Sequence, residues 1–296
     1  MSQTKEILKK IKKLDIKTKQ LVDGLISGNY NSIFKGQGIE FSEIRDYRAG
    51  DDIRTIDWKV TARFNHPYIK EFIEERDLQV YFVIDVSGSG NFGTSISKQE
   101  KSFEIIASLM FAALGNNDGV GVFLITDDME KFIPAKKGRK HILQLLDIIT
   151  TFTPNSSKTN LKKPLEQVSK TIKRKSIVFV ISDFIDTNEY VKPLKVLRKH
   201  HDVVALRIVD PREREIPDVG MIELEDDETG EQILVDTSDE EFRNSYSRLI
   251  AENDTRFLTS MMKNKIDTIS LSTDQNYPTS LKRFFKKRIG ENGRIR

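Results

Sequence analysis

Cysteine is absent from the 296 residues of this chain. Its absence excludes a disulfide scaffold, a thiol nucleophile and any zinc or iron–sulfur site held by cysteine. No apolar run approaches the roughly 20 residues that cross a bilayer. The first residues also lack the apolar stretch of a secretory signal before lysines resume. We therefore expect a cytoplasmic protein.

Charge is unevenly distributed along the chain. Residues 1–20 carry seven lysines and two acidic residues, and residues 282–296 carry seven basic residues and one acidic residue. Because the whole chain has a net charge of +3, the residues between these ends carry −8. The basic ends either are simply solvated or make weak contact with an anionic surface. Few aromatic residues accompany them, which disfavours nucleic acid as the partner.

Apolar runs of strand length alternate with helical patterns through the middle of the chain. This alternation predicts parallel strands joined by right-handed crossovers. The expected fold class is α/β: a doubly wound, mostly parallel, Rossmann-like sheet with helices on both faces. The predicted strands are 78–85, 119–126, 176–182, 202–210 and 267–272, and the predicted helices are 98–115, 139–150, 161–173, 187–199 and about 238–264.

Three segments are expected along the chain. Residues 1–76 form an irregular segment that contains a helix over the first 27 residues and some β-structure. Residues 77–275 form the sheet domain, with a hairpin insertion near 211–236. Residues 276–296 form a basic C-terminal helix and tail.

Polar residues gather where the predicted strands end. Asp85, Ser87 and Ser89 follow one strand, Asp183 follows another, and the 157–161 loop adds hydroxyl groups. Ligands of doubly wound folds bind at this edge of the sheet. Donors that are all oxygen suit Mg²⁺ or Mn²⁺ better than Zn²⁺. The alternative is that Asp85 or Asp183 only caps the next helix.

The familiar hydrolase patterns are incomplete, so we expect no enzymatic activity and no catalytic residues. A haloacid-dehalogenase-type phosphatase needs a second acid two residues after Asp85, where Ser87 stands. Gly-x-Ser-x-Gly around Ser89 fails at the same position, and no phosphate-binding P-loop is present. A phosphatase-like, metal-dependent hydrolase using Asp85 stays an alternative.

Residues 34–76 are dense in charges of both signs. They form either a network of arginine–carboxylate pairs that fixes an irregular segment or a partner-binding surface. Trp58 is expected to be packed. The residues assigned to this network or surface are Glu40, Arg45, Asp51, Asp52, Arg54, Asp57, Trp58 and Arg63.

Asp-x-Ser-x-Ser at Asp85–Ser89, followed by a distant Thr and a distant Asp, resembles the metal-ion-dependent adhesion site of von Willebrand factor A domains. The resemblance implies that Asp85, Ser87, Ser89, Thr159 and Asp183 bind or position Mg²⁺. It also implies that a carboxylate of a partner protein fills an open coordination position.

A second resemblance rests on Gly36-x-Gly38-x-Glu40-Phe41, Arg45-x-Tyr47, Gly50-Asp51-Asp52, Ile56-Asp57-Trp58 and Glu74-Glu75-Arg76. These elements are similar to those of the bacterial "domain of unknown function 58" family. Members of that family are von Willebrand A-like and are often encoded beside MoxR-type AAA+ ATPases. The resemblance implies an adaptor or co-chaperone that works with a MoxR-type ATPase or with its client protein. Peripheral attachment to the inner membrane through the basic ends stays open.

Overall fold

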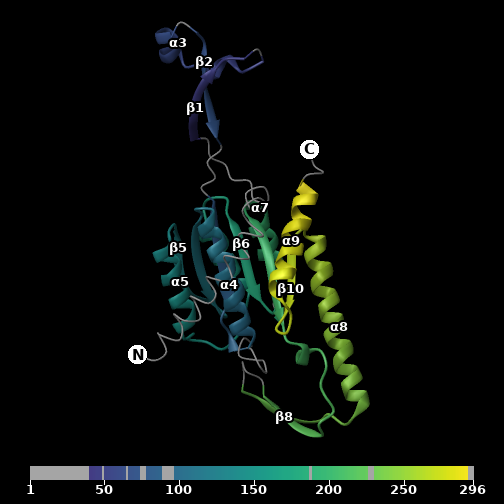
Figure 1. Ribbon diagram of the computed structural model, residues 1–296. Coiled ribbons are helices and arrows are strands. Elements are labelled where there is room, and N and C mark those ends of the chain that lie inside the picture. Colours follow the sequence, from purple (N-terminus) through teal and green to yellow (C-terminus); the bar gives the residue numbers. More distant parts are fainter. Residues whose placement is uncertain are drawn as a thin grey trace. The chain divides into compact units, whose positions relative to one another are not determined.

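The computed structural model describes residues 40–48, 50–64, 66–73, 78–88, 97–186, 189–225 and 230–292. These residues belong to two compact units, a small one within residues 35–78 and a large one from residue 79 onward (Figure 1). The predicted helix over the first 27 residues and the predicted ligand Ser89 lie outside the described residues.

The large unit is built on a six-stranded sheet in the order β10-β7-β6-β3-β4-β5. All neighbouring pairs are parallel except β4 and β5, which are antiparallel. The predicted α/β class is thus confirmed. The antiparallel edge strand β5 is not among the predicted strands. The strands are β3 (Gln79–Asp85), β4 (Gly119–Ile125), β5 (Met129–Lys136), β6 (Ile177–Ser182), β7 (Asp202–Val209) and β10 (Asp267–Ser272).

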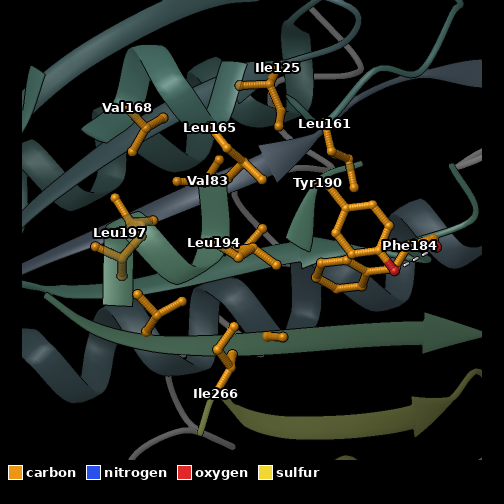
Figure 2. Close-up of a cluster of buried hydrophobic side chains, with 14 of the residues drawn as sticks. Val83, Ile125, Leu161, Leu165, Val168, Phe184, Tyr190, Leu194, Leu197 and Ile266 are labelled. Carbon is orange, nitrogen blue, oxygen red and sulfur yellow. Dashed lines mark hydrogen bonds between the residues drawn. The ribbon is translucent and has the colours of Figure 1, made fainter. Parts of the chain in front are cut away.

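Helices cover both faces of this sheet because its central strands are apolar on both sides. Helices α6, α7 and α8 share one core cluster with the strands, and Figure 2 shows Leu165 and Leu194 lying beside Val83. On the other face α4 packs against α5, and the Ser108 and Tyr277 hydroxyls join α4 to α9. The helices are α4 (Lys98–Gly115), α5 (Arg139–Thr151), α6 (Lys162–Thr171), α7 (Val191–His200), α8 (Glu240–Lys263) and α9 (Tyr277–Asn292).

The basic C-terminal helix is tied to the start of two strands. The guanidinium of Arg288 lies 2.6 Å from a carboxylate oxygen of Asp202 and 3.0 Å from one of Asp267. These aspartates are the first residues of β7 and β10. At least one cation of this basic end therefore stabilises the fold and does not face solvent.

Between β7 and α8 the chain forms the turn η3 (Pro211–Glu213) and an antiparallel hairpin. The hairpin strands are β8 (Met221–Glu225) and β9 (Gln232–Asp236). This hairpin lies where the sequence predicts an insertion.

The small unit is an antiparallel pair of strands with two short helices between them. Strand β1 (Glu40–Asp46) pairs with β2 (Tyr68–Ile73), and η1 (Ile53–Thr55) and α3 (Trp58–Phe64) connect them. The side chain of Asp52 accepts the N–H of Arg54, and the side chain of Asp57 accepts the N–H of Lys59. Both aspartates thus satisfy N–H groups that the helix starts leave unpaired.

Trp58 is not packed, so the expectation for it is wrong. Its side chain is 70% exposed, and the arginines on either side of it, Arg54 and Arg63, are exposed as well. The physical reason is the shortness of α3, which has no buried residue and opens with Trp58. A unit of this size has too little core to cover an indole ring.

Arg45 and Asp51 form a two-pronged ion pair that closes the chain between β1 and η1. Arg45 Nη1 and Nη2 lie 2.8 and 3.0 Å from the Asp51 carboxylate oxygens, which also accept the N–H of Arg48. Hydrogen bonds from Arg45 and then from Arg48 lower the pKa of Asp51 to about 2. Such a paired carboxylate stabilises the folded form only while it is ionised.

Replacing Asp51 with asparagine is therefore expected to speed hydrogen exchange of the β1–β2 amides and of the Arg48 amide. Hydrogen exchange with mass spectrometry, corrected for intrinsic rates, measures this. Asp46→Asn is the matched control, because the Asp46 carboxylate is exposed and lies 3.9 Å from His66, too far for a hydrogen bond. The usual pKa is 3.8 and the folded value about 2, so this contribution is present above about pH 4 and disappears as the pH falls to about 2. Equal exchange in the two variants would contradict the expectation.

Candidate functional site

Asp85 and Asp183 come to the same edge of the sheet because their strands are parallel neighbours. Strand β3 ends at Asp85, and β6 ends at Ser182, one residue before Asp183. In the register of the two strands Ile84 lies opposite Ile181, which brings Asp85 level with Ser182. Two of the five predicted metal-binding residues therefore come from adjacent strand ends.

The Asp85 carboxylate is held by hydroxyl and amide donors. Ser182 Oγ donates to Oδ2 of Asp85 over 2.7 Å, and the N–H of Ser87 donates to Oδ1 over 3.1 Å. Ser87 itself is buried. Ser182 is not among the predicted site residues, although it is the last residue of a predicted strand.

A third loop joins this edge through its backbone. The N–H of Gly88 donates to the carbonyl oxygen of Ser157 over 2.9 Å, and the N–H of Leu161 donates to Oδ2 of Asp186 over 2.8 Å. Thr159 lies between these two anchored positions. The structure thus places Asp85, Ser87, Thr159 and Asp183 at one sheet edge, where the sequence analysis expects them.

The turn after Asp183 is held in an uncommon backbone conformation. Phe184 has a backbone φ of 57°, a value that residues other than glycine rarely adopt. Its ring is buried with its centroid 5.7 Å from that of Tyr190 and 5.0 Å from that of Phe257 (Figure 2). Its N–H donates to Ser182 Oγ. Buried aromatic packing therefore fixes the direction in which Asp183 leaves the sheet.

Lys98 and Glu213 are part of the site, although neither is among the residues predicted from the sequence. Lys98 begins α4, its side chain is only 5% exposed, and its Nζ lies 2.8 Å from Asp183 Oδ2 and 2.5 Å from Glu213 Oε1. Glu213 is fixed in turn because its Oε2 accepts the N–H of Asp210. Lys98 is the first residue of a predicted helix and Glu213 comes three residues after a predicted strand, so both stand next to connections that reach this edge.

The electrostatics of the site are those of crowded carboxylates. Withdrawal from water and then the negative charge of Asp183 raise the pKa of Asp85 to about 6. Burial alone would lower the pKa of Lys98, but Asp183 and Glu213 outweigh it and raise that pKa. The region therefore favours cations, and Lys98 provides one of them at the Asp183 carboxylate.

Arg207 connects this region to α8. Its Nε donates to the carbonyl oxygen of Asp183 over 2.9 Å, and its Nη1 lies 2.6 Å from Asp254 Oδ1. The guanidinium also sits 5.0 Å from the centroid of the Phe257 ring. The buried guanidinium of Arg207, on β7, therefore holds the backbone of the loop that bears Asp183.

The residues of the site fit a hard divalent cation in chemistry, though not in number of carboxylates. Across the described ranges, no three His, Asp or Glu side chains form a group that could hold a metal ion. The predicted set contains only two carboxylates, and its remaining donors are hydroxyl oxygens. A mixed set of this kind, completed by water, suits Mg²⁺ or Mn²⁺.

Among the helices that the structure describes, none combines the length and the apolar character of a membrane-spanning segment.

The chain is similar to a described protein family and to proteins of other bacteria. A family model described as "Protein of unknown function DUF58" matches residues 43–256. The chain is 29% identical over 281 residues to the uncharacterized protein Rv1480 of Mycobacterium tuberculosis, covering 94% of this chain and 88% of the relative. It is 28% identical over 105 residues to the uncharacterized protein YeaD of Bacillus subtilis, covering 36% of this chain and 24% of the relative. The matched span includes Arg45, Asp85 and Glu213.

Solved structures with a similar chain course are also known. The protein BatB from Bacteroides thetaiotaomicron has 16% identity and a TM-score of 0.48, covering 72% of this chain and 99% of its own. A von Willebrand factor type A protein from Catenulispora acidiphila has 12% identity and a TM-score of 0.38, covering 88% of this chain and 51% of its own.

Proposed function

We propose that this chain, which belongs to the DUF58 family of proteins of unknown function, is a non-catalytic, metal-dependent protein-interaction module. The observation that supports this proposal is the meeting of Asp85 and Asp183 beside Ser87 and the Thr159 loop. These groups offer oxygen donors at the sheet edge where doubly wound folds bind their ligands.

In the proposed site Ser87, Ser89 and Thr159 coordinate or position the ion. Asp85 and Asp183 bind it directly or through water. When bound, Mg²⁺ supplies an open coordination position for a carboxylate of the partner. Ser182 orients Asp85 by donating its hydroxyl, and Lys98 balances the charge of Asp183. Ser87 stands where a phosphatase would need a general acid, and a hydroxyl is too weak an acid for that task.

The proposed partner is a MoxR-type AAA+ ATPase or the client that such an ATPase remodels. This proposal rests on the resemblance carried by the 34–76 block. We place the protein in the cytoplasm, where its exposed basic residues could also hold it weakly at the inner membrane. Exposed charges act over only about 8 Å at physiological ionic strength, so such attachment is salt-sensitive.

A titration of the 296-residue chain with a candidate MoxR-type ATPase, with and without EDTA, tests the proposal. Chelation, Ser87→Ala and Thr159→Ala are each expected to weaken the complex about tenfold or more. Chelation removes the ion, and each substitution removes a hydroxyl group that holds or positions it. The matched control is Ser270→Ala, which removes an exposed hydroxyl of β10. An Asp or Glu→Ala change in the partner should not add to Asp85→Ala, since both remove one shared bond.

Two results would count against the proposal. Binding that is indifferent to EDTA and to Asp85 would move the contact surface elsewhere, most directly to the charged small unit. Metal-dependent turnover of phosphatase, esterase or nucleotidase substrates, lost in Asp85→Ala, would instead establish the alternative of a hydrolase.

A further inference from the structure

The β8–β9 hairpin is a two-stranded sheet without a core partner in the described part of the chain. Neither strand contains a buried residue. No other described helix or strand packs extensively against it, and Figure 1 shows it apart from the central sheet. It is anchored at its base, where the Thr237 hydroxyl donates to the carbonyl oxygen of Gly220. Two-stranded sheets are marginal in water unless something packs on them.

The register of the hairpin gathers its aliphatic side chains on one face. Ile222 lies opposite Val235, and Leu224 lies opposite Ile233. Because opposed residues share a face and neighbours along a strand alternate, these four form an uninterrupted aliphatic face. On it Ile233 is exposed and the other three side chains are half-buried. The opposite face is mixed and bears Met221, Leu234, Glu223, Glu225, Gln232 and Asp236.

This aliphatic face belongs to the most acidic stretch of the sequence. Residues 215–241 contain twelve Asp and Glu and no Lys or Arg. A second copy of the hairpin is a poor occupant, because its charge would oppose close approach. An anionic membrane or nucleic acid is disfavoured for the same reason. The occupant must combine aliphatic side chains with positive charge.

One segment of the chain has this combination. Residues 1–20 carry seven lysines against Glu6 and Asp15, a net charge of +5. Ile7, Ile11 and Leu14 recur at the spacing of one helix face, between the lysines. The basic residues at the other end are less suited, since Arg288 is already held by two aspartates.

We propose that the β8–β9 hairpin is the docking site of the Lys-rich segment 1–20, which lays its aliphatic residues on Ile222, Leu224, Ile233 and Val235. Its lysines lie among the surrounding carboxylates. The hairpin supplies an apolar surface and the negative electrostatic field of its carboxylates. The segment supplies the apolar packing partner that a two-stranded sheet needs. This docking does not depend on the metal site or on its partner.

Zero-length carbodiimide cross-linking of the full-length chain, followed by mass spectrometry, tests the proposal. This reagent joins a carboxylate to an amine only when the two are in contact. Cross-links are expected between carboxylates of 215–241 and lysines of 1–20. Leu224→Ser with Ile233→Ser should lower their yield about tenfold, equivalent to about 1.4 kcal/mol. The matched control is Met221→Ser with Leu234→Ser, which changes the same two strands on the opposite face and should leave the yield unchanged.

A variant with Lys9→Glu, Lys10→Glu and Lys13→Glu removes most of the attraction without touching the hairpin. Cross-links are then counted only at the lysines that it keeps, which are Lys5, Lys12, Lys17 and Lys19. Their loss cannot be ascribed to an unfolded hairpin or to missing amines. Salt at about 1 M, which shortens the screening length to about 3 Å, should weaken the contact in the wild type. Mixing labelled and unlabelled chains shows whether the segment comes from the same chain or a second copy, and either result supports this occupant. The proposal is overturned if the hairpin carboxylates link mainly to other lysines, or if the two serine variants behave alike.

Discussion

Lys98→Met is expected to destabilise the large unit by about 3–5 kcal/mol in the presence of EDTA, because it leaves Asp183 and Glu213 without their shared cation. The ammonium group is almost fully enclosed, with a side-chain exposure of 5%. Methionine has a side chain of similar length. The loss of stability therefore reports mainly the removal of the ammonium charge. Urea unfolding followed by circular dichroism measures the change in the free energy of unfolding.

Lys101→Met is the matched control for this experiment. Lys101 is in the same helix and is also buried, but its Nζ donates to the carbonyl oxygen of Gln275 and not to a carboxylate. Its replacement should therefore be clearly less damaging. Adding Glu213→Gln to Lys98→Met should restore part of the lost stability, because one of the two uncompensated charges is then gone. Equal losses for the two lysines would show that Lys98 is not a counter-ion.

Asp85→Asn is expected to stabilise the metal-free protein, whereas Lys98→Met destabilises it. The pKa of Asp85 is about 6 in the folded chain against an ordinary 3.8, so the fold binds the proton more tightly than the unfolded chain does. Wild-type stability should therefore fall as the pH rises from about 4 to about 6. The asparagine variant escapes this fall and should be more stable by up to about 3 kcal/mol at about pH 8.

The same substitution should abolish the effect of Mg²⁺. Wild-type protein is expected to gain stability with Mg²⁺, since a ligand that binds only the folded form raises its free energy of unfolding. Calorimetric titration should give one weak site in the wild type and none in Asp85→Asn. A wild-type chain that neither binds Mg²⁺ or Mn²⁺ nor gains stability from them would falsify the metal site. A stabilising change that removes binding is typical of residues kept for function.

The central sheet could be predicted because burial on both faces leaves a plain pattern in the sequence. β4 and β6 have no exposed residue, and their apolar runs stand out against the charged remainder. Edge strand β5 alternates between partly buried and exposed residues and contains Pro134, so its pattern is weak. The predicted helix 187–199 starts too early, because α7 begins at Val191. Pro193 lies in its first turn, where the missing N–H is harmless.

The site was predictable only as far as its residues follow strand ends. Asp85 and Asp183 could be found in this way because parallel strands end at one edge. Lys98 and Glu213 are separated by 115 positions in the sequence. No local sequence pattern indicates that the Lys98 ammonium group contacts the η3 turn. The exposure of Trp58 was missed for a related reason, since the sequence does not say how little core surrounds a short helix.

The Arg288 contacts determine which way the protein would face if it were attached to a support. Helix α9 starts after β10 ends and finishes beside Asp202 and Asp267, at the amino ends of β7 and β10. Asp85, Asp183 and Glu213 lie at the carboxyl ends of the strands. A tether joined beyond α9 therefore emerges on the side opposite these carboxylates. A chain held on a bead, a sensor surface or a bilayer by that tether would present Asp85 outward to whatever diffuses past.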